Sequence, residues 1–406
     1  MSKPVLLMLL SRHPYAEQSG RAAMLRQRIE QARLRFEPHI IVFGPRAGDV
    51  RDEGLHFMAM AGPASVALNA ARLSRLPMQT WLYHSAEART RLAHMAAETR
   101  AAAIYVDMLR LAPLARDAAE GAALIVDYDD LLSERYARAV GEDYEVMGFL
   151  AGRFGPLARV ARLFASPLLE AESARCAAYE REMLARAQLV LFTSPREAAS
   201  VAPAGAQVMA GPPLTAVRGD GGTPGRRLIF LGNMRYGENV LMLRALARAA
   251  AALAADGALA DDVVIDVVGE HAPELPGEFD ARRFRFLGRI ADLGELANAG
   301  VFLAPVVSGS GVKLKVLDGM ALGCPVVGTA KACEGLGVRA NRELILARDP
   351  TEVLRLAIAL RDRERLKRML AARARAYLEQ HHAPAIGERV AEAMLAAARR
   401  PRQETL

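Results

Sequence analysis

The stretch PVVSGSGVKLKVLDGMALGCPVVGT, residues 305–329, decides the fold because a glycine-rich loop and a helix join two strand-like runs in it. A short strand is expected over 301–304, and the Gly/Ser loop 308–311 follows it. The apolar spacing then predicts a helix from about 312 to 322, which Gly323 ends. A strand, a glycine loop and a helix in this order are typical of parallel α/β sheets.

The loop and the start of this helix predict a site for a phosphorylated ligand. Free backbone amides at a helix start and the helix dipole attract phosphate, and glycines let the backbone approach it closely. Lys313 is expected in the first turn, where the dipole disfavours a cation, so its charge favours a role in binding. Lys315 and Asp318 are three residues apart and share one helix face. The alternative is that both lysines are solvated and the glycines only form a turn.

Strand-like runs alternate with helical stretches along the chain, which predicts parallel, doubly wound α/β sheets. The expected strands are Val5–Leu10, His39–Phe43, Thr80–Tyr83, Ala103–Val106, Leu124–Asp127, Leu189–Thr193, Arg227–Leu231, Val263–Val268, Phe284–Leu287, Val301–Ala304 and Pro325–Gly328. A Pro- and Gly-rich linker over 202–225 interrupts the series. We therefore expect two Rossmann-like domains, 1–205 and 206–380, that face a central cleft. A terminal helix is expected within 381–406. It packs either on the C-terminal domain or back on the N-terminal domain.

The composition limits the classes of partner and compartment. The 406 residues suit two domains, and the net charge of +7 favours an anionic partner, although arginine as the default surface residue explains much of that excess. Cys176, Cys324 and Cys333 have no metal-ligand spacing and cannot all pair within the chain, which fits a reducing cytosol. The chain contains no run of about 18 apolar residues, so we expect no membrane span. Only the net charge favours nucleic acid, so we expect no nucleic-acid partner. We also expect no metal, because no zinc-ligand spacing is visible.

The opening stretch also resembles the donor-binding segment of GT-B glycosyltransferases, in particular the retaining, metal-independent enzymes of the glycosyltransferase family 4 type. The residues that match the family pattern are Gly309, Gly311, Lys313, Lys315, Leu317, Met320, Ala321, Gly323, Pro325, Val326, Val327 and Thr329. LIFLGNMRYGENVLML (228–243) resembles the strand and glycine loop that open the second domain of this family. FRFLGRIADLGELANAGVFLAPV (284–306) resembles the segment that holds the nucleotide base, and IVDYDDLLSERYARA (125–139) resembles an Asp-rich segment of one branch.

The resemblance implies a role for each matched position. Gly311, Val312 and Lys313 would present backbone amides to the donor diphosphate. Lys313 or Lys315 would neutralise the leaving nucleotide diphosphate in place of a metal, so no cofactor is expected. Asp318 would hold the ribose hydroxyls. The other positions expected near the donor, a UDP- or GDP-sugar, are Gly20, Gly232, Asn233, Arg235, Gly269, Arg289, Ile290, Ser308, Gly309 and Ser310.

Two positions depart from the family pattern. Many relatives carry a glutamate eight residues before the ribose carboxylate, where this chain has Ser310, and the shorter Asp318 replaces a second glutamate. Asn239 stands where a lysine is frequent. The first departure leaves the donor sugar open.

Polar residues after strands of the first domain are the acceptor-side candidates. His84 follows TWLY and Asp107 follows AIYV, with Arg110 one turn further on. We expect His84 and Asp107 to act at the acceptor, and the alternative for each is a surface or capping residue. Asp129 and Asp130 also follow a strand, and for them the alternative is that one of the two caps the helix that begins near residue 131.

The sequence as a whole predicts a glycosyltransferase. The stretch 149–169 mixes arginines with large apolar residues, which fits either docking of the first domain on an anionic membrane or an ordinary amphipathic helix. We expect a cytoplasmic enzyme, peripheral on the inner membrane face, that transfers a hexose from a nucleotide-diphosphate sugar to a glycan or lipid-linked saccharide with retention. The alternatives are a non-catalytic sugar-nucleotide-binding protein and a nucleotide-sugar 2-epimerase, which the sparse acidic residues near 308–318 disfavour.

Overall fold

The computed structural model divides the chain into two α/β units. The residues that it describes are 2–16, 19–118, 121–140, 165–201, 205–307 and 311–400. The first unit comprises Met1–Gly211 and Gly387–Leu406, and the second comprises Pro212–Ile386. Each boundary falls six residues after the position that the sequence analysis gives it. Both units are built on parallel sheets, and the predicted α/β fold class is confirmed.

The first sheet has seven parallel strands in the order β3-β2-β1-β4-β5-β6-β7. Their bounds are β1 (Val5–Leu10), β2 (Glu37–Phe43), β3 (Leu55–Met58), β4 (Ala103–Asp107), β5 (Ala123–Asp129), β6 (Leu189–Phe192) and β7 (Gln207–Ala210). The chain adds β2 and β3 on one side of β1 and then returns to add β4 on the other side. The carboxyl ends of β1 and β4 therefore flank a topological switch point, where open α/β sheets bind ligands.

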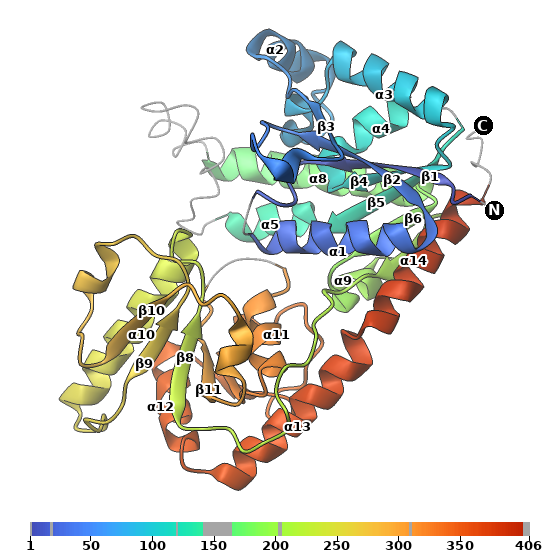
Figure 1. The fold of residues 1–406 in the computed structure, drawn as a ribbon. Helices are drawn as coiled ribbons and strands as arrows, with labels where there is room; N and C mark the ends of the chain where they lie inside the picture. Colours follow the sequence, from blue (N-terminus) through green and yellow to red (C-terminus); the bar gives the residue numbers. More distant parts are fainter. Residues whose placement is uncertain are drawn as a thin grey trace. The chain divides into compact units, whose positions relative to one another are not determined.

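Helices cover both faces of this sheet (Figure 1). They are α1 (Gly20–Arg35), α2 (Pro63–Arg72), α3 (Ala86–Thr99), α4 (Ala112–Ala118), α5 (Leu132–Ala139), α8 (Ala165–Arg186), α9 (Pro195–Ser200) and α14 (Pro384–Ala398), with 3-10 turns η1 (Val50–Asp52), η2 (Met78–Leu82) and η3 (Leu109–Leu111). Because side chains alternate along a strand, Leu6 and Met8 pack with α1 and α14, whereas Leu7 and Leu9 pack with α3, α4 and α8. The terminal helix α14 buries Val390 and Met394 in the first of these two cores.

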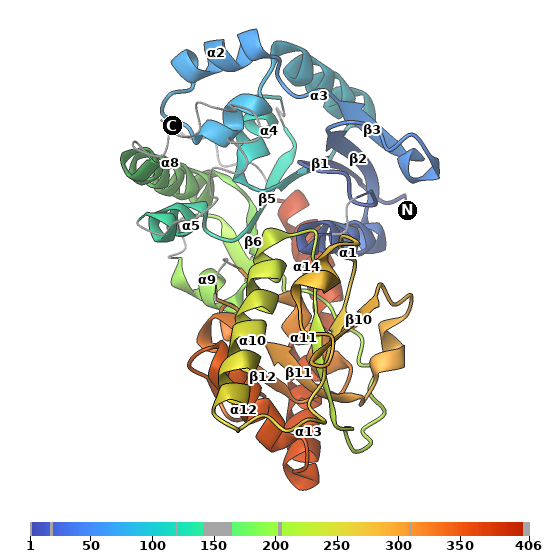
Figure 2. The same cartoon turned by 90° about the vertical axis from the view of Figure 1, so that its left-hand side faces the viewer.

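The second sheet has six parallel strands in the order β10-β9-β8-β11-β12-β13. They are β8 (Arg227–Leu231), β9 (Ile265–Val268), β10 (Phe284–Gly288), β11 (Gly300–Ala304), β12 (Val326–Thr329) and β13 (Ile345–Ala347). The helices are α10 (Gly237–Ala255), α11 (Leu314–Ala321), α12 (Pro350–Leu360) and α13 (Glu364–His381), with turns η6 (Leu275–Glu278), η7 (Leu293–Leu296) and η8 (Ala330–Cys333). The helix α12 packs against β11, β12, β13 and α10, which Figure 2 shows beside it, and α11 packs against α13.

The strand predicted at Thr80–Tyr83 is wrong, because these residues belong to the 3-10 turn η2 and its end. Pro77 starts the turn with its fixed φ, and its carbonyl oxygen accepts hydrogen bonds from the backbone nitrogen and the hydroxyl of Thr80. The side-chain amide of Asn69 donates to two carbonyl groups at the end of this segment. The aromatic residues that gave the segment its strand-like composition therefore lie in a turn that α2 holds.

The linker predicted over 202–225 is partly wrong. Gln207–Ala210 forms β7, which pairs in parallel with β6. A four-residue run with three apolar positions is too short to stand out among glycines and prolines, so its pairing with β6 decides its structure. The short strands β3 and β13 were missed for the same reason.

The membrane expectation was placed on residues 149–169. Residues 149–164 lie outside the described part of the chain, and Ala165–Leu169 open the helix α8. Among the helices that the structure describes, none combines the length and the apolar character needed to cross a bilayer.

The substitution Gly319→Ala is expected to destabilise the second unit, although alanine in a helix is favoured over glycine by about 1 kcal/mol. A Cβ atom at position 319 would lie 2.6 Å from the fully buried ring of Phe302. Chemical denaturation should show a free energy of unfolding lower by about 1–3 kcal/mol. The matched control is Gly277→Ala, whose Cβ would meet nothing within 4 Å. A Gly319→Ala variant with the free energy of unfolding of the wild type would contradict the close packing of Gly319 against Phe302.

Candidate functional site

Three glycines bring the carboxyl ends of neighbouring strands of the second sheet into close contact. Gly269 follows β9 with φ at +132°, and a Cβ on it would lie 1.9 Å from the carbonyl oxygen of Gly232, which follows β8. The backbone nitrogen of Gly269 also donates to the carbonyl oxygen of Gly288 at 2.8 Å. This edge of the sheet therefore exposes backbone rather than side chains at two of the predicted donor positions, Gly232 and Gly269.

The helix α11 begins at Leu314, two residues later than the sequence predicts. Gly311 is in the left-handed region, with φ at +72°, and Lys313 takes the N-cap position instead of lying in the first turn. A left-handed residue cannot be part of a right-handed helix, which explains the later start. Gly311, Val312 and Lys313 thus form the approach to the helix. The predicted positions Ser308, Gly309 and Ser310 lie outside the described residues.

Lys315 is a largely buried cation that an asparagine holds in place. Its Nζ atom donates to Oδ1 of Asn239 at 2.5 Å and lies 5.5 Å from the centre of the Phe230 ring. The amide nitrogen of Asn239 in turn donates to the carbonyl oxygen of Asn233 at 2.7 Å. Burial and, to a smaller extent, the nearby charge of Lys313 lower the pKa of Lys315 to about 8, and the charge of Glu238 opposes this shift. Asn239, which departs from the family pattern, is therefore a positioning residue for Lys315.

Asp318 lies one turn further along α11. Burial raises the pKa of its carboxyl group to about 6, and the charge of Arg218 only partly opposes this rise. Within the described residues, none donates a hydrogen bond to its carboxylate oxygens. A half-buried carboxylate of this kind has acceptor capacity for the hydroxyl groups of a ligand. Its predicted contact with ribose stays a prediction.

The remaining donor-side positions are spread over both units. Arg235 is exposed, and its Nε atom donates to Oε1 of Glu270 at 2.6 Å. Arg289 and Ile290 follow β10, and Ile290 packs against the core of the second unit. Gly20 lies in the first unit, where it is the first residue of α1. The donor contacts proposed for these residues stay predictions.

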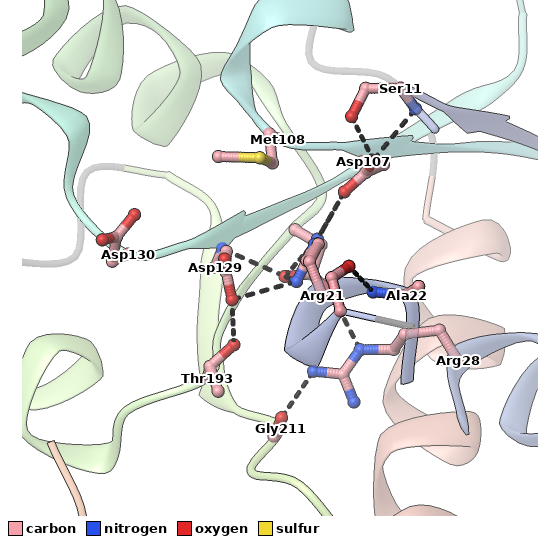
Figure 3. Close-up of polar contacts among 12 residues, drawn as sticks. Ser11, Arg21, Ala22, Arg28, Asp107, Met108, Asp129, Asp130, Thr193 and Gly211 are labelled. Atoms are coloured by element: carbon pink, nitrogen blue, oxygen red, sulfur yellow. Dashed lines mark hydrogen bonds and ion pairs between the residues drawn. The ribbon is translucent and has the colours of Figure 1, made fainter. Parts of the chain in front are cut away.

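A buried network of arginines and aspartates lies at the carboxyl edge of the first sheet (Figure 3). The Nε atom of Arg21 donates to Oδ1 of Asp107 at 2.8 Å, and its Nη1 atom lies 3.1 Å from Oδ1 of Asp129. The Nε atom of Arg28 donates to Oδ2 of Asp127 at 2.7 Å. Arg28, Asp107 and Asp127 are fully buried. The network therefore ties the start of α1 to the ends of β4 and β5.

Sequence analysis missed Arg21 and Arg28, although α1 contains a signal for them. The two arginines are seven residues apart on the helix face that also buries Leu25, Ile29 and Ala32. A charged residue in an apolar stripe needs a buried partner. Aspartates at the ends of neighbouring strands are such partners, but the sequence does not show which of them lies opposite each arginine.

Asp107, predicted to act at the acceptor, has both carboxylate oxygens engaged. Its Oδ2 atom accepts hydrogen bonds from the backbone nitrogen of Ser11 at 2.9 Å and from the Ser11 hydroxyl at 2.6 Å. Its Oδ1 atom accepts from Arg21. Burial by itself would raise the pKa of Asp107, but Arg21 and Ser11 outweigh burial and lower it. This geometry favours a role in holding Arg21, and the predicted role at the acceptor remains untested.

His84, the other acceptor-side candidate, follows the turn η2. Its Nε2 atom lies 3.1 Å from Oδ2 of Asp117. Burial would raise the pKa of Asp117, but hydrogen bonds from His84 and Arg116 outweigh burial and lower it. His84 is thus part of an ion-pair network with Asp117 and Arg116, and its predicted role at an acceptor stays a prediction.

Comparison with known proteins identifies the second unit. Residues 225–362 match the family model described as "Glycosyl transferases group 1". This region, which makes up most of the second unit, is therefore similar to the group 1 glycosyltransferases. No curated protein matches its sequence. The family resemblance predicted from the stretch at residues 305–329, which lies within the matched region, is therefore confirmed.

Solved structures of glycosyltransferases share the fold of the whole chain. Sucrose-phosphate synthase from Thermosynechococcus elongatus aligns with a TM-score of 0.64 at 16% identity, over 96% of this chain and 98% of that chain. HepE from Anabaena, solved in complex with UDP, gives 0.62 at 14% identity, over 98% and 100%. WaaG, a glycosyltransferase involved in lipopolysaccharide biosynthesis, gives 0.54 at 16% identity, over 95% and 98%. The chain therefore shares the GT-B fold of these glycosyltransferases, as predicted.

The substitution Asp127→Asn should destabilise the first unit, because it leaves Arg28 buried without its partner. Removing one member of a buried ion pair costs about 3–5 kcal/mol, which denaturant unfolding at pH 7 would measure. Burial would raise the pKa of Asp127, but Arg21 and Arg28 outweigh it and lower the pKa to about 2. The stabilisation is therefore present above about pH 4, the unfolded value, and is lost as the pH falls through 2.

The variant should consequently lose less stability than the wild type between pH 4 and pH 2. Asp49→Asn is the control, since Asp49 is exposed and its ion pair is with the equally exposed Arg51. We expect no measurable effect of this control at pH 7. Wild-type stability in the Asp127→Asn variant would show that the network does not hold the first unit together.

Proposed function

We propose that the protein is a group 1 glycosyltransferase that transfers a hexose from a nucleotide-diphosphate sugar to a glycan or lipid-linked saccharide, with retention at the anomeric carbon and without a metal. The observation that carries the proposal is the geometry of Lys315. A largely buried ammonium, fixed by Asn239 near the start of α11, is suited to a multiply charged anion.

The surroundings of Lys315 support a diphosphate as that anion. Gly311 turns the chain into the N-terminus of α11, where free backbone amides and the helix dipole favour negative charge. Gly232 and Gly269 keep side chains away from the ends of β8 and β9. A nucleoside diphosphate bound along this edge would have its charge neutralised by Lys315 when the bond to the sugar breaks. The UDP in the HepE complex makes a uridine nucleotide the first donor to test.

A retaining transfer requires little more of the protein than an oriented donor and acceptor and positive charge near the leaving diphosphate. The diphosphate is a good leaving group once its negative charge is stabilised, and preorganised cations and dipoles supply that stabilisation. Asp318 has free acceptor capacity for the hydroxyl groups of the ribose, which would fix the nucleotide relative to Lys315. Positioning of donor and acceptor then contributes the rest of the rate enhancement.

The acceptor class is supported by relatives and by charge. WaaG takes part in lipopolysaccharide biosynthesis, and its fold is shared by this chain. The net charge of +7 is consistent with work on an anionic, membrane-associated saccharide. We therefore place the reaction at the cytoplasmic face of a membrane.

The decisive experiment begins with a thermal-shift comparison of UDP, GDP, ADP and dTDP, followed by hydrolysis of the sugar donors that match the stabilising nucleotide. The wild type should release nucleoside diphosphate and free sugar. Lys315→Met should lower the rate by about 10²–10³-fold, since it removes a charge that acts on the leaving group. Lys3→Met is the control, because Lys3 is an exposed lysine of the first unit that donates to the carbonyl oxygen of Arg33. Stabilisation by a nucleotide without turnover of any donor would instead indicate a non-catalytic binding protein.

The affinity for UDP should fall as the pH rises, because Lys315 is only partly charged above its pKa of about 8. A bound diphosphate favours the charged form, so binding takes up a proton at high pH, and the Kd should rise by up to about tenfold per pH unit between 8 and 9. Isothermal titration calorimetry from pH 7 to pH 9 measures this dependence. Lys315→Met should bind more weakly at pH 7 and lack the dependence, and identical pH profiles in both proteins would contradict the assignment.

A further inference from the structure

Arg110 is a buried cation that has no carboxylate partner among the described residues. It lies on η3, directly after β4, and is only 8% exposed. Its Nε atom is buried without a hydrogen-bond partner, and its Nη2 atom contacts the sulphur of Met108 at 2.8 Å. A thioether sulphur is a weak acceptor and carries no charge. Arg21 and Arg28, by contrast, are each paired with buried aspartates.

The nearest candidate counterion is already committed. Asp107 lies three residues before Arg110 and attracts its charge, but the two carboxylate oxygens of Asp107 accept their hydrogen bonds from Arg21 and Ser11. A buried guanidinium without a partner is strongly unfavourable, so natural proteins bury one where an anion binds or where a carboxylate faces it. Since the described carboxylates do not pair with Arg110, the structure leaves an unmet requirement for an anion beside η3.

The position of Arg110 in the sheet is where a ligand is expected. It follows β4 at the carboxyl edge, next to the end of β1, and the strand order reverses between these two strands. Met108 joins β4 to η3 with φ at 64° and ψ at 154°, a conformation that residues other than glycine rarely adopt. Backbone strain of this kind is concentrated at ligand sites, where the surrounding fold maintains it. The strained residue sets the direction in which η3 leaves the strand.

A hydrogen-bond acceptor lies close to the same turn. The turn η2 packs against η3 and contributes Gln79, whose Nε2 atom donates to the hydroxyl of Tyr136. The Oε1 atom of Gln79 is buried and has no hydrogen-bond partner in the described part of the chain. Burial raises the pKa of Tyr136 to about 12, and the charge of Arg110 opposes that rise, so the two groups are near one another. The region thus offers an unpaired cation and an unpaired acceptor oxygen together.

We propose that Arg110 binds a phosphate group of the acceptor, with Gln79 as the acceptor of a hydrogen bond from a hydroxyl of the attached sugar. The planar guanidinium matches two phosphate oxygens at once. A sugar phosphate supplies both an oxyanion and hydroxyl groups, and lipid-linked saccharides carry phosphate at the position that joins lipid and sugar. The inference rests on the proposed transfer reaction, and it selects a phosphate-bearing acceptor over a neutral glycan.

The test uses the full-length protein saturated with UDP, so that the nucleotide site is already filled. Inorganic phosphate, glucose 1-phosphate and methyl glucoside are titrated calorimetrically. Wild type should bind glucose 1-phosphate, and Arg110→Gln should bind it at least about tenfold more weakly, which is the loss expected for one charge-assisted contact. Arg89→Gln, an exposed arginine on α3, makes the same change in net charge and should bind like the wild type.

The three probes separate the sources of the phosphate. Tighter binding of glucose 1-phosphate than of inorganic phosphate, with no binding of methyl glucoside, supports a sugar-phosphate acceptor. Equal binding of inorganic phosphate and glucose 1-phosphate would overturn the acceptor assignment. Equal affinity of wild type and Arg110→Gln for glucose 1-phosphate, or no binding of it at all to the wild type, would overturn the proposal altogether.

The melting temperature distinguishes a binding role of Arg110 from a structural role, because the two roles predict opposite changes when Arg110 is replaced. Without phosphate, Arg110→Met should melt at a higher temperature than the wild type, because it removes an uncompensated buried charge, whereas Arg28→Met should melt lower. A lower melting temperature for Arg110→Met would show that Arg110 serves the fold and would overturn the proposal. These measurements need no turnover. If the protein binds glucose 1-phosphate through Arg110 but cleaves no sugar donor, the proposed transfer reaction is wrong and the proposed phosphate site still holds.

Discussion

The hydrogen bond between the ammonium of Lys315 and the amide oxygen of Asn239 is the interaction on which the functional interpretation depends. It holds a cation at the carboxyl edge of the second sheet, where burial makes the charge unfavourable until an anion arrives. The backbone constraints nearby serve the same end, because Gly232 and Gly269 contact each other through main-chain atoms and leave the strand ends free of side chains. Lys315 is therefore preorganised for a bound anion, since the charge of Glu238 only partly offsets the effect of burial on its pKa.

Compensation of charge distinguishes structural cations from candidate binding residues in both units. In the first unit Arg21 and Arg28 are satisfied by Asp107 and Asp127, and this network fixes α1 against the ends of two strands. Arg110 lies at the same edge without a described carboxylate partner. Lys315 in the second unit is likewise held by a neutral amide rather than by an acid. Lys315 and Arg110 are the two cations that we propose to contact the donor and the acceptor.

The sequence predicts the strands well where they are long and apolar, and it fails where tertiary contacts decide. Val5–Leu10 and Arg227–Leu231 have the predicted bounds because their apolar runs end at clear turn residues. The segment at Thr80–Tyr83 has a similar composition but is held as a turn by Asn69 and Pro77. Family motifs point to Lys315, but its partner Asn239 is 76 residues away, and Arg21 is 86 residues from Asp107. No local pattern encodes such pairings, and for this reason the role of Asn239 and the two buried arginines emerged only from the fold.

The most direct test of the central claim is the titration of the lysine side chains by nuclear magnetic resonance, with and without UDP. The chain has only five lysines, so the Lys315 signal can be assigned by comparison with the Lys315→Met variant. The free protein should show a lysine with a pKa of about 8, and saturation with UDP should raise the pKa of that lysine by at least about one unit, since one unit corresponds to a single favourable contact with the diphosphate. A Lys315 whose titration is unchanged by bound UDP would contradict the account.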